Sequence, residues 1–112
     1  MKNNKEQLNM NILDKIKKIN LNGVDFYWMF SMKSLYILFE RFDYNSENEV
    51  FEKLNKGNII TLLQIFYSGV LWDKEGEVSF DDFLLFLNNK DYIREIDEFL
   101  SENLKDFLYP RK

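Results

Sequence analysis

Apolar residues alternate with polar ones on both sides of a potential turn near the N-terminus of the chain. Residues 19–28 carry an apolar side chain at every second position on either side of Asn22-Gly23. This period is typical of a half-buried β-strand, and Asn-Gly tolerates the positive φ angles of a type I′ turn. The pattern predicts a two-stranded hairpin, with Tyr27 and Met29 on its second face.

Beyond the hairpin the apolar period changes to that of an α-helix. Ser31, Ser46 and Ser79 are placed to accept hydrogen bonds from the first turns of helices. Five helices are predicted, from Ser31 to 43–45, Ser46 to Gly57, Asn58 to Val70, Ser79 to 88–89, and Asp91 to Leu108.

The apolar faces of these helices differ in width. The first helix is expected to bury the stripe Met32, Leu35, Tyr36, Phe39 and Phe42. The helix that follows Asn58 is apolar nearly all round, as is usual for a helix at the centre of a domain. Because the chain is short, burial of that helix on every side is hard to achieve without a second chain.

The predicted fold is therefore mainly α, with a small N-terminal β-hairpin followed by four to five packed helices. Residues 19–112 are expected to form a single helical domain, since no linker or internal repeat divides them. Residues 1–18 are polar and rich in Asn and Lys, which predicts a flexible or partly helical N-terminal extension.

Charge and residue types narrow the chemistry available to this chain of 112 residues. It contains no Cys and no His, so thiolate sites, disulfides and histidine acid–base catalysis are excluded, and no enzyme activity is expected. Residues 19–112 hold ten basic and seventeen acidic residues, an acidic body unsuited to nucleic acid. No segment reaches the length of a membrane span, and a cytoplasmic location is predicted.

The aromatic content of 17% is high for so short a chain. Aromatic side chains dominate both cores and interfaces, and most of them are expected in the core. Apolar residues outside the main stripes are the candidates for partner binding: Tyr27, Met29, Ile37, Leu38, Tyr67, Leu71 and Trp72.

The acidic segment around Gly76 resembles the second half of an EF-hand calcium loop. With Gly76 at loop position 6, Asp73 falls at position 3 and Asp82 at position 12. The first ligand position falls on Leu71, which offers no side-chain oxygen, and Asp82 is shorter than the usual Glu. High-affinity calcium binding is not expected, no cofactor or metal is predicted, and a turn leading into a capped helix is the simpler interpretation.

Four segments follow one another along the chain: Ile-Asn-Leu-Asn-Gly-Val-Asp-Phe at 19–26, Phe-Ser-Met-Lys-Ser-Leu-Tyr-Ile-Leu-Phe-Glu at 30–40, the helix at 59–72 and Val-Ser-Phe-Asp-Asp-Phe at 78–83. In this order they resemble the tail assembly chaperones of long-tailed bacteriophages and prophages. The resemblance covers about residues 19–108 and rests on order and local pattern. The N-terminal extension departs from the family.

The resemblance implies a chaperone that binds the hydrophobic tape measure protein and keeps it soluble during tail tube assembly. It further implies self-association, the tail tube protein as a second partner, the cytoplasm of the bacterial host as location, and absence from the mature virion. A structural tail or head completion protein and a degenerate EF-hand-like binding module remain the alternatives.

Overall fold

The predicted hairpin is present at the start of the described chain. The computed structural model describes residues 15–73 and 76–105, so most of the predicted N-terminal extension lies outside the described residues. Strand β1 (Lys17–Leu21) begins two residues before the predicted domain start and pairs antiparallel with β2 (Val24–Trp28). Asn22 and Gly23 have φ angles of 52° and 80°, as a type I′ turn requires.

Five helices follow the hairpin in the described residues, which confirms the mainly α fold. They are α2 (Met32–Phe42), α3 (Glu47–Asn55), α4 (Ile59–Gly69), α5 (Phe80–Leu87) and α6 (Lys90–Asn103). The last helix starts one residue before its predicted start, and residues 106–108 of its predicted end lie outside the described residues.

The starts of α3 and α5 carry the serine hydrogen bonds that the sequence predicted. The hydroxyl of Ser46 accepts the Glu49 N–H, and that of Ser79 accepts the Asp82 N–H, each at 3.1 Å. The side chain of Asn58 does the same for α4, at 3.0 Å from the Thr61 nitrogen. These bonds satisfy N–H groups that have no partner within the helix.

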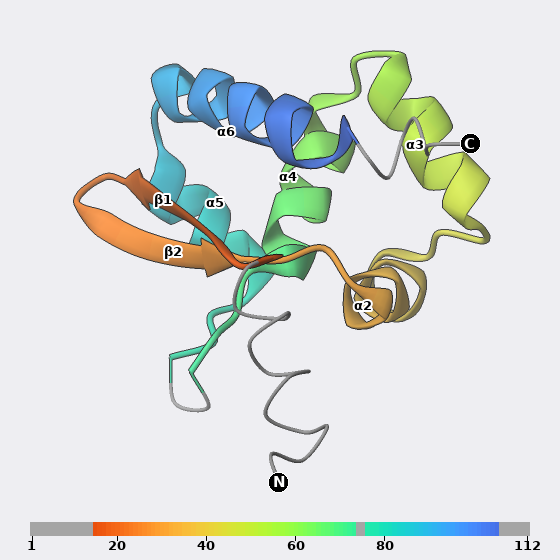
Figure 1. Cartoon of the computed structure of the whole chain (residues 1–112), viewed down its shortest axis with the longest axis horizontal. Helices are drawn as coiled ribbons and strands as arrows, with labels where there is room; N and C mark the ends of the chain where they lie inside the picture. Colours follow the sequence, from red (N-terminus) through yellow and green to blue (C-terminus); the bar gives the residue numbers. More distant parts are fainter. Residues whose placement is uncertain (1–14, 74–75, 106–112) are drawn as a thin grey trace, which may run out of the picture.

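Helix α4 lies at the centre of the molecule, with α2, α3, α5 and α6 packed around it (Figure 1). From Thr61 to Gly69 every residue except Gln64 is buried. Burial on every side was expected to be hard without a second chain: the other helices and the hairpin cover most of α4, but Ile59 and Ile60 in its first turn are 54% and 51% exposed. Its buried hydroxyls are paired: Thr61 with Tyr44 at 2.6 Å, and Ser68 with the Ile65 carbonyl at 2.8 Å.

Trp28 joins the hairpin to α4. Its ring stacks on Phe66 with a centroid separation of 6.4 Å, and its indole N–H donates to the Phe66 carbonyl at 2.9 Å. Gly69 lies against the same ring, so closely that a Cβ there would stand 2.6 Å from Trp28 Cε2. The absence of a side chain at residue 69 is therefore what lets the tryptophan reach the helix backbone.

Gly69→Ala is expected to destabilise the fold, because the added methyl must displace a buried indole ring. Overpacking of this kind costs roughly 1–3 kcal/mol in the free energy of unfolding, which urea denaturation followed by tryptophan fluorescence would measure. Gly76→Ala is the matched control, since a Cβ at residue 76 has its nearest neighbour at 3.6 Å. Equal stability of the two variants would contradict the proposed role of the Trp28 contact.

Candidate binding surfaces

The seven residues predicted to face a partner fall into three groups. Tyr27 and Leu71 are exposed, as expected. Met29 and Trp72 are half-buried. The predicted exposure is wrong for three residues, which belong to the buried core: Ile37, Leu38 and Tyr67.

The error on α2 is one of helical phase. The helix buries Leu35, Ile37 and Leu38 together with Ser34, and turns part of the predicted core stripe to the outside. Ser34 can be buried because its hydroxyl accepts the Ser31 N–H at 3.1 Å and donates to the Met29 carbonyl at 3.4 Å. Because both bonds involve its hydroxyl group, Ser34 carries no unpaired polar side-chain atom into the core.

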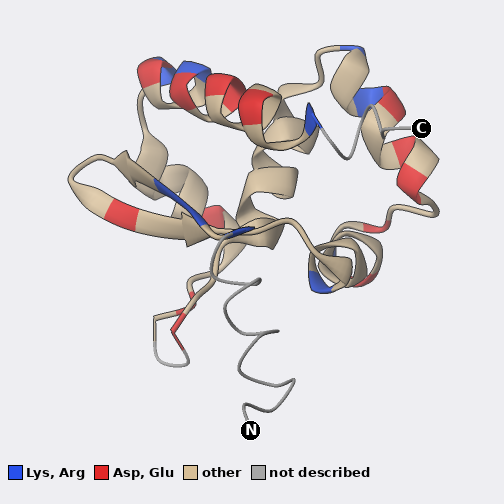
Figure 2. Ribbon diagram, viewed as in Figure 1, with Lys and Arg blue, Asp and Glu red and all other residues tan. Residues whose placement is uncertain are grey.

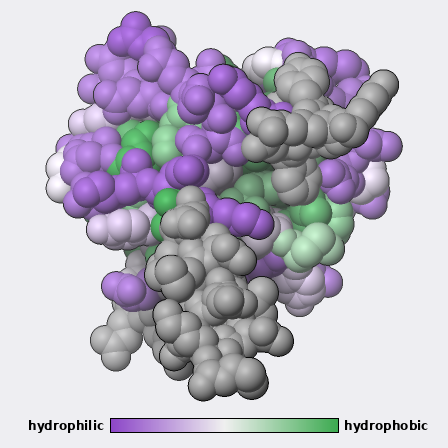
Figure 3. Space-filling view, viewed as in Figure 1, coloured by the Kyte–Doolittle hydropathy of each residue, from purple (hydrophilic) through white to green (hydrophobic). Residues whose placement is uncertain are grey.

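An apolar stripe therefore runs along the outer side of α2. Met32, Tyr36 and Phe39 are 78%, 63% and 37% exposed, and their spacing of four and three residues places them on one helical face. We call this set the α2 stripe. Figure 3 shows hydrophobic surface in the region of α2, at the right of the view. Among the aromatic residues that the structure describes, only Tyr27, Tyr36 and Phe39 are exposed.

A second exposed pair joins the hairpin to the segment after α4. Trp28 and Val70 form an antiparallel bridge, and the Leu71 N–H donates to the Tyr27 carbonyl at 2.7 Å. Tyr27 and Leu71 are therefore cross-strand neighbours, whose side chains share the outward face. The structure brings these two predicted residues together, although they are far apart in sequence.

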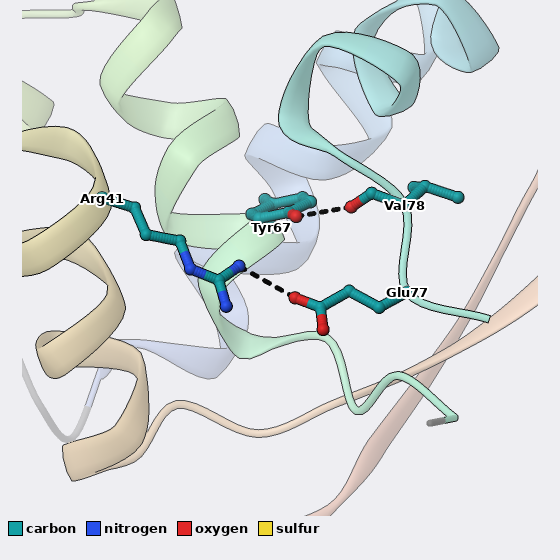
Figure 4. Close-up of polar contacts among 4 residues, drawn as sticks. All are labelled: Arg41, Tyr67, Glu77 and Val78. Atoms are coloured by element: carbon teal, nitrogen blue, oxygen red, sulfur yellow. Dashed lines mark hydrogen bonds and ion pairs between the residues drawn. The ribbon is translucent and has the colours of Figure 1, made fainter. Parts of the chain in front are cut away.

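Polar contacts hold the segment after Leu71 against the helices (Figure 4). Arg41 of α2 forms an ion pair with Glu77 at 2.8 Å, and the Tyr67 hydroxyl of α4 donates to the Val78 carbonyl. The hydrogen bond to Glu77 raises the pKa of Arg41. Burial raises the pKa of Tyr67 above the ordinary 10.0, and the nearby Glu77 carboxylate adds to this effect.

The acidic segment does not assemble a metal site from the residues described. No group of three or more Asp or Glu side chains there, or elsewhere in 15–73 and 76–105, could hold a metal ion. Gly76 lacks the positive φ found at Gly23 and Gly57, and Asp82 lies in the first turn of α5. The carboxylates are instead spread over the surface, with many on α6 and α3 (Figure 2).

The raised pKa of Tyr67 predicts a loss of stability at high pH. Below pH 10 the tyrosine is neutral in both the folded and the unfolded chain, so its contribution is fully present. Above pH 10 the unfolded chain releases the proton first, so the contribution falls as the pH approaches the folded pKa. Tyr67→Phe should flatten the fall in unfolding free energy that the native chain shows above pH 10.

Urea denaturation at several pH values would measure this effect. Tyr67→Phe also removes the hydrogen bond to Val78, and a loss of about 1 kcal/mol is expected at neutral pH. Tyr27→Phe is the control, since it removes an exposed hydroxyl. The assignment fails if Tyr67→Phe and the native chain lose stability in parallel as the pH rises.

None of the helices in the described residues combines the length and the hydrophobicity that crossing a lipid bilayer requires. No known protein family, curated protein or solved structure matches this chain. What the chain binds must therefore be inferred from its own surface and from the local sequence patterns.

Proposed function

We propose that this chain is a bacteriophage or prophage tail assembly chaperone, a non-catalytic protein that binds the tape measure protein and keeps it soluble. The observation that carries the proposal is the α2 stripe. Met32, Tyr36 and Phe39 stand outward on a helix that already has a fully used core face. The exposed apolar surface of these side chains is available to cover a hydrophobic client.

The chemistry of the stripe suits a helical client. A methionine and two aromatic residues offer large apolar area, and the flexible thioether can adjust to differently shaped partners. Such a surface binds the apolar face of an amphipathic helix without demanding one fixed sequence. The described residues carry fifteen acidic and ten basic side chains, and this excess charge favours the solubility of a complex with an apolar client.

The rest of the proposal follows from the resemblance in the sequence. The chaperone acts in the cytoplasm of the bacterial host while the tail tube polymerises, and it is absent from the mature virion. Self-association and contact with the tail tube protein belong to the same proposal. A structural tail or head completion protein would need the same kind of apolar surface. The two functions differ in whether the protein is present in the mature virion.

Coexpression with a tape measure fragment tests the proposal. The fragment should move from the insoluble to the soluble fraction when this chain is present. Met32→Ser combined with Tyr36→Ser should weaken the complex by about tenfold or more, because two large exposed apolar contacts are lost. Both sites are exposed, so the free energy of unfolding should change by only about 0.5 kcal/mol.

Leu85→Ser is the matched control, because Leu85 is 75% exposed but lies on α5, away from the stripe. A fragment that stays insoluble beside the native chain would overturn the chaperone assignment. Equal loss of solubility with Leu85→Ser would show that general hydrophobicity, and not the α2 stripe, is responsible. Detection of the chain in purified particles by mass spectrometry would favour the structural component.

A further inference from the structure

An apolar groove runs along α6, and no residue of α2 lines it. Two cavities of about 320 and 390 Å³ adjoin each other here, because Leu54, Leu62 and Asp97 line both of them. We call the two together the α6 groove. Leu54 comes from α3 and Leu62 from α4, and most of the other lining residues belong to α6. Figure 1 shows where these three helices lie.

The groove has the dimensions of a helix-binding site. Along its wall, α6 contributes Lys90, Ile93, Arg94, Asp97, Leu100 and Ser101. These positions recur every three or four residues and span about 16 Å at 1.5 Å per residue, which is three helical turns. Leu104 and Lys105 extend the same wall beyond the end of α6.

The charge of the groove is opposite to that of the molecule. Its charged lining residues are Lys90, Arg94, Lys105 and Asp97, a net charge of +2. The described residues as a whole hold ten basic and fifteen acidic side chains, a net charge of −5. An acidic segment is attracted to these cations where it displaces Asp91 and Glu102, which pair with Arg94 and Lys105 in the free chain.

Two of the basic lining residues form ion pairs with carboxylates of α6, and a carboxylate of a partner could replace these. Arg94 lies 3.2 Å from Asp91, and Lys105 lies 3.0 Å from Glu102. All four side chains are more than 60% exposed, and ion pairs at such exposure contribute little to stability. A carboxylate on a partner can therefore replace the intrahelical one at small cost.

The apolar walls favour a helical occupant over an extended one. The half-buried Leu54 and Ile93, above a floor of the buried Leu62, Leu100 and Leu104, offer no hydrogen bonds to a bound backbone. An extended strand laid against them would bury unpaired N–H and C=O groups, whereas a helix satisfies its own backbone. The apolar partner side chains then fill the groove while the polar ones reach its rim.

We infer that the α6 groove binds an amphipathic helix of another protein, with an apolar stripe and acidic residues flanking it. This site is separate from the α2 stripe, and the inference does not require that the partner be the tape measure protein. Ile59, which lines the groove and is 54% exposed, provides an additional apolar contact at its α4 side.

A pair of synthetic helical peptides tests the inference on the full chain. One peptide carries leucines at intervals of three and four residues with Glu at the flanking positions, and the other has Lys in place of each Glu. Fluorescence anisotropy should show the Glu peptide binding at least tenfold more tightly, with the difference shrinking as salt is added. Lys90→Glu combined with Arg94→Glu should abolish or reverse this preference.

Two controls match the variants. Lys17→Glu with Lys18→Glu makes the same change in net charge on β1, where neither residue lines the groove, and should keep most of the preference. Ile59→Ser should weaken binding of the Glu peptide severalfold, whereas Leu85→Ser should leave it unchanged because Leu85 does not line the groove. Retained far-ultraviolet circular dichroism would show that each variant is folded.

Several outcomes overturn the inference. They are equal affinity for both peptides, no binding by the native chain, and a preference that survives the Lys90 and Arg94 changes. A concentration-dependent dimer in sedimentation experiments that is lost in the charge-reversed variant, without peptide binding, would assign the groove to a second copy of the chain. Because the assay contains no tape measure protein, its failure would leave solubilisation through the α2 stripe untouched.

Discussion

The contact between Trp28 and α4 is the interaction on which the rest of the structure depends. A two-stranded hairpin is marginal in water by itself, so it needs a large apolar anchor. Trp28 supplies one by stacking on Phe66, bonding to its carbonyl and lying against Gly69. The same approach aligns Val70 and Leu71 with the end of β2 and so creates the exposed Tyr27–Leu71 pair.

With α4 at the centre, each surrounding helix can turn only one face toward the core. Helix α2 has an apolar face broader than the core can cover, so burying Leu35 and Leu38 leaves Met32 and Tyr36 outside. The exposed stripe is thus a consequence of an apolar excess that a single central helix cannot absorb. Met32 and Tyr36 are 78% and 63% exposed, so covering them with a partner would remove apolar surface from water and stabilise the complex.

The features predicted correctly from the sequence are those determined locally. The hairpin turn needs only Asn22-Gly23, and the starts of α3 and α5 need only Ser46 and Ser79. The face of α2 that is buried could not be predicted in this way. The helix has apolar residues on both the predicted and the observed core face, and tertiary contacts determine which face is buried. One local signal was available: a serine three residues after the Ser31 cap can pair with the cap backbone, which turns Ser34 and its neighbours inward.

The two apolar surfaces differ in a way that bears on selectivity. The α2 stripe is formed by Met32, Tyr36 and Phe39, none of which is charged, so it discriminates poorly among apolar helices. The α6 groove adds Lys90 and Arg94 at its rim, and repulsion there disfavours basic partners as strongly as attraction favours acidic ones. If one client reaches both surfaces, binding at the first makes the second intramolecular, and weak contacts at each combine into a tight complex. Selectivity would then reside in the groove, while the stripe would supply affinity common to many clients.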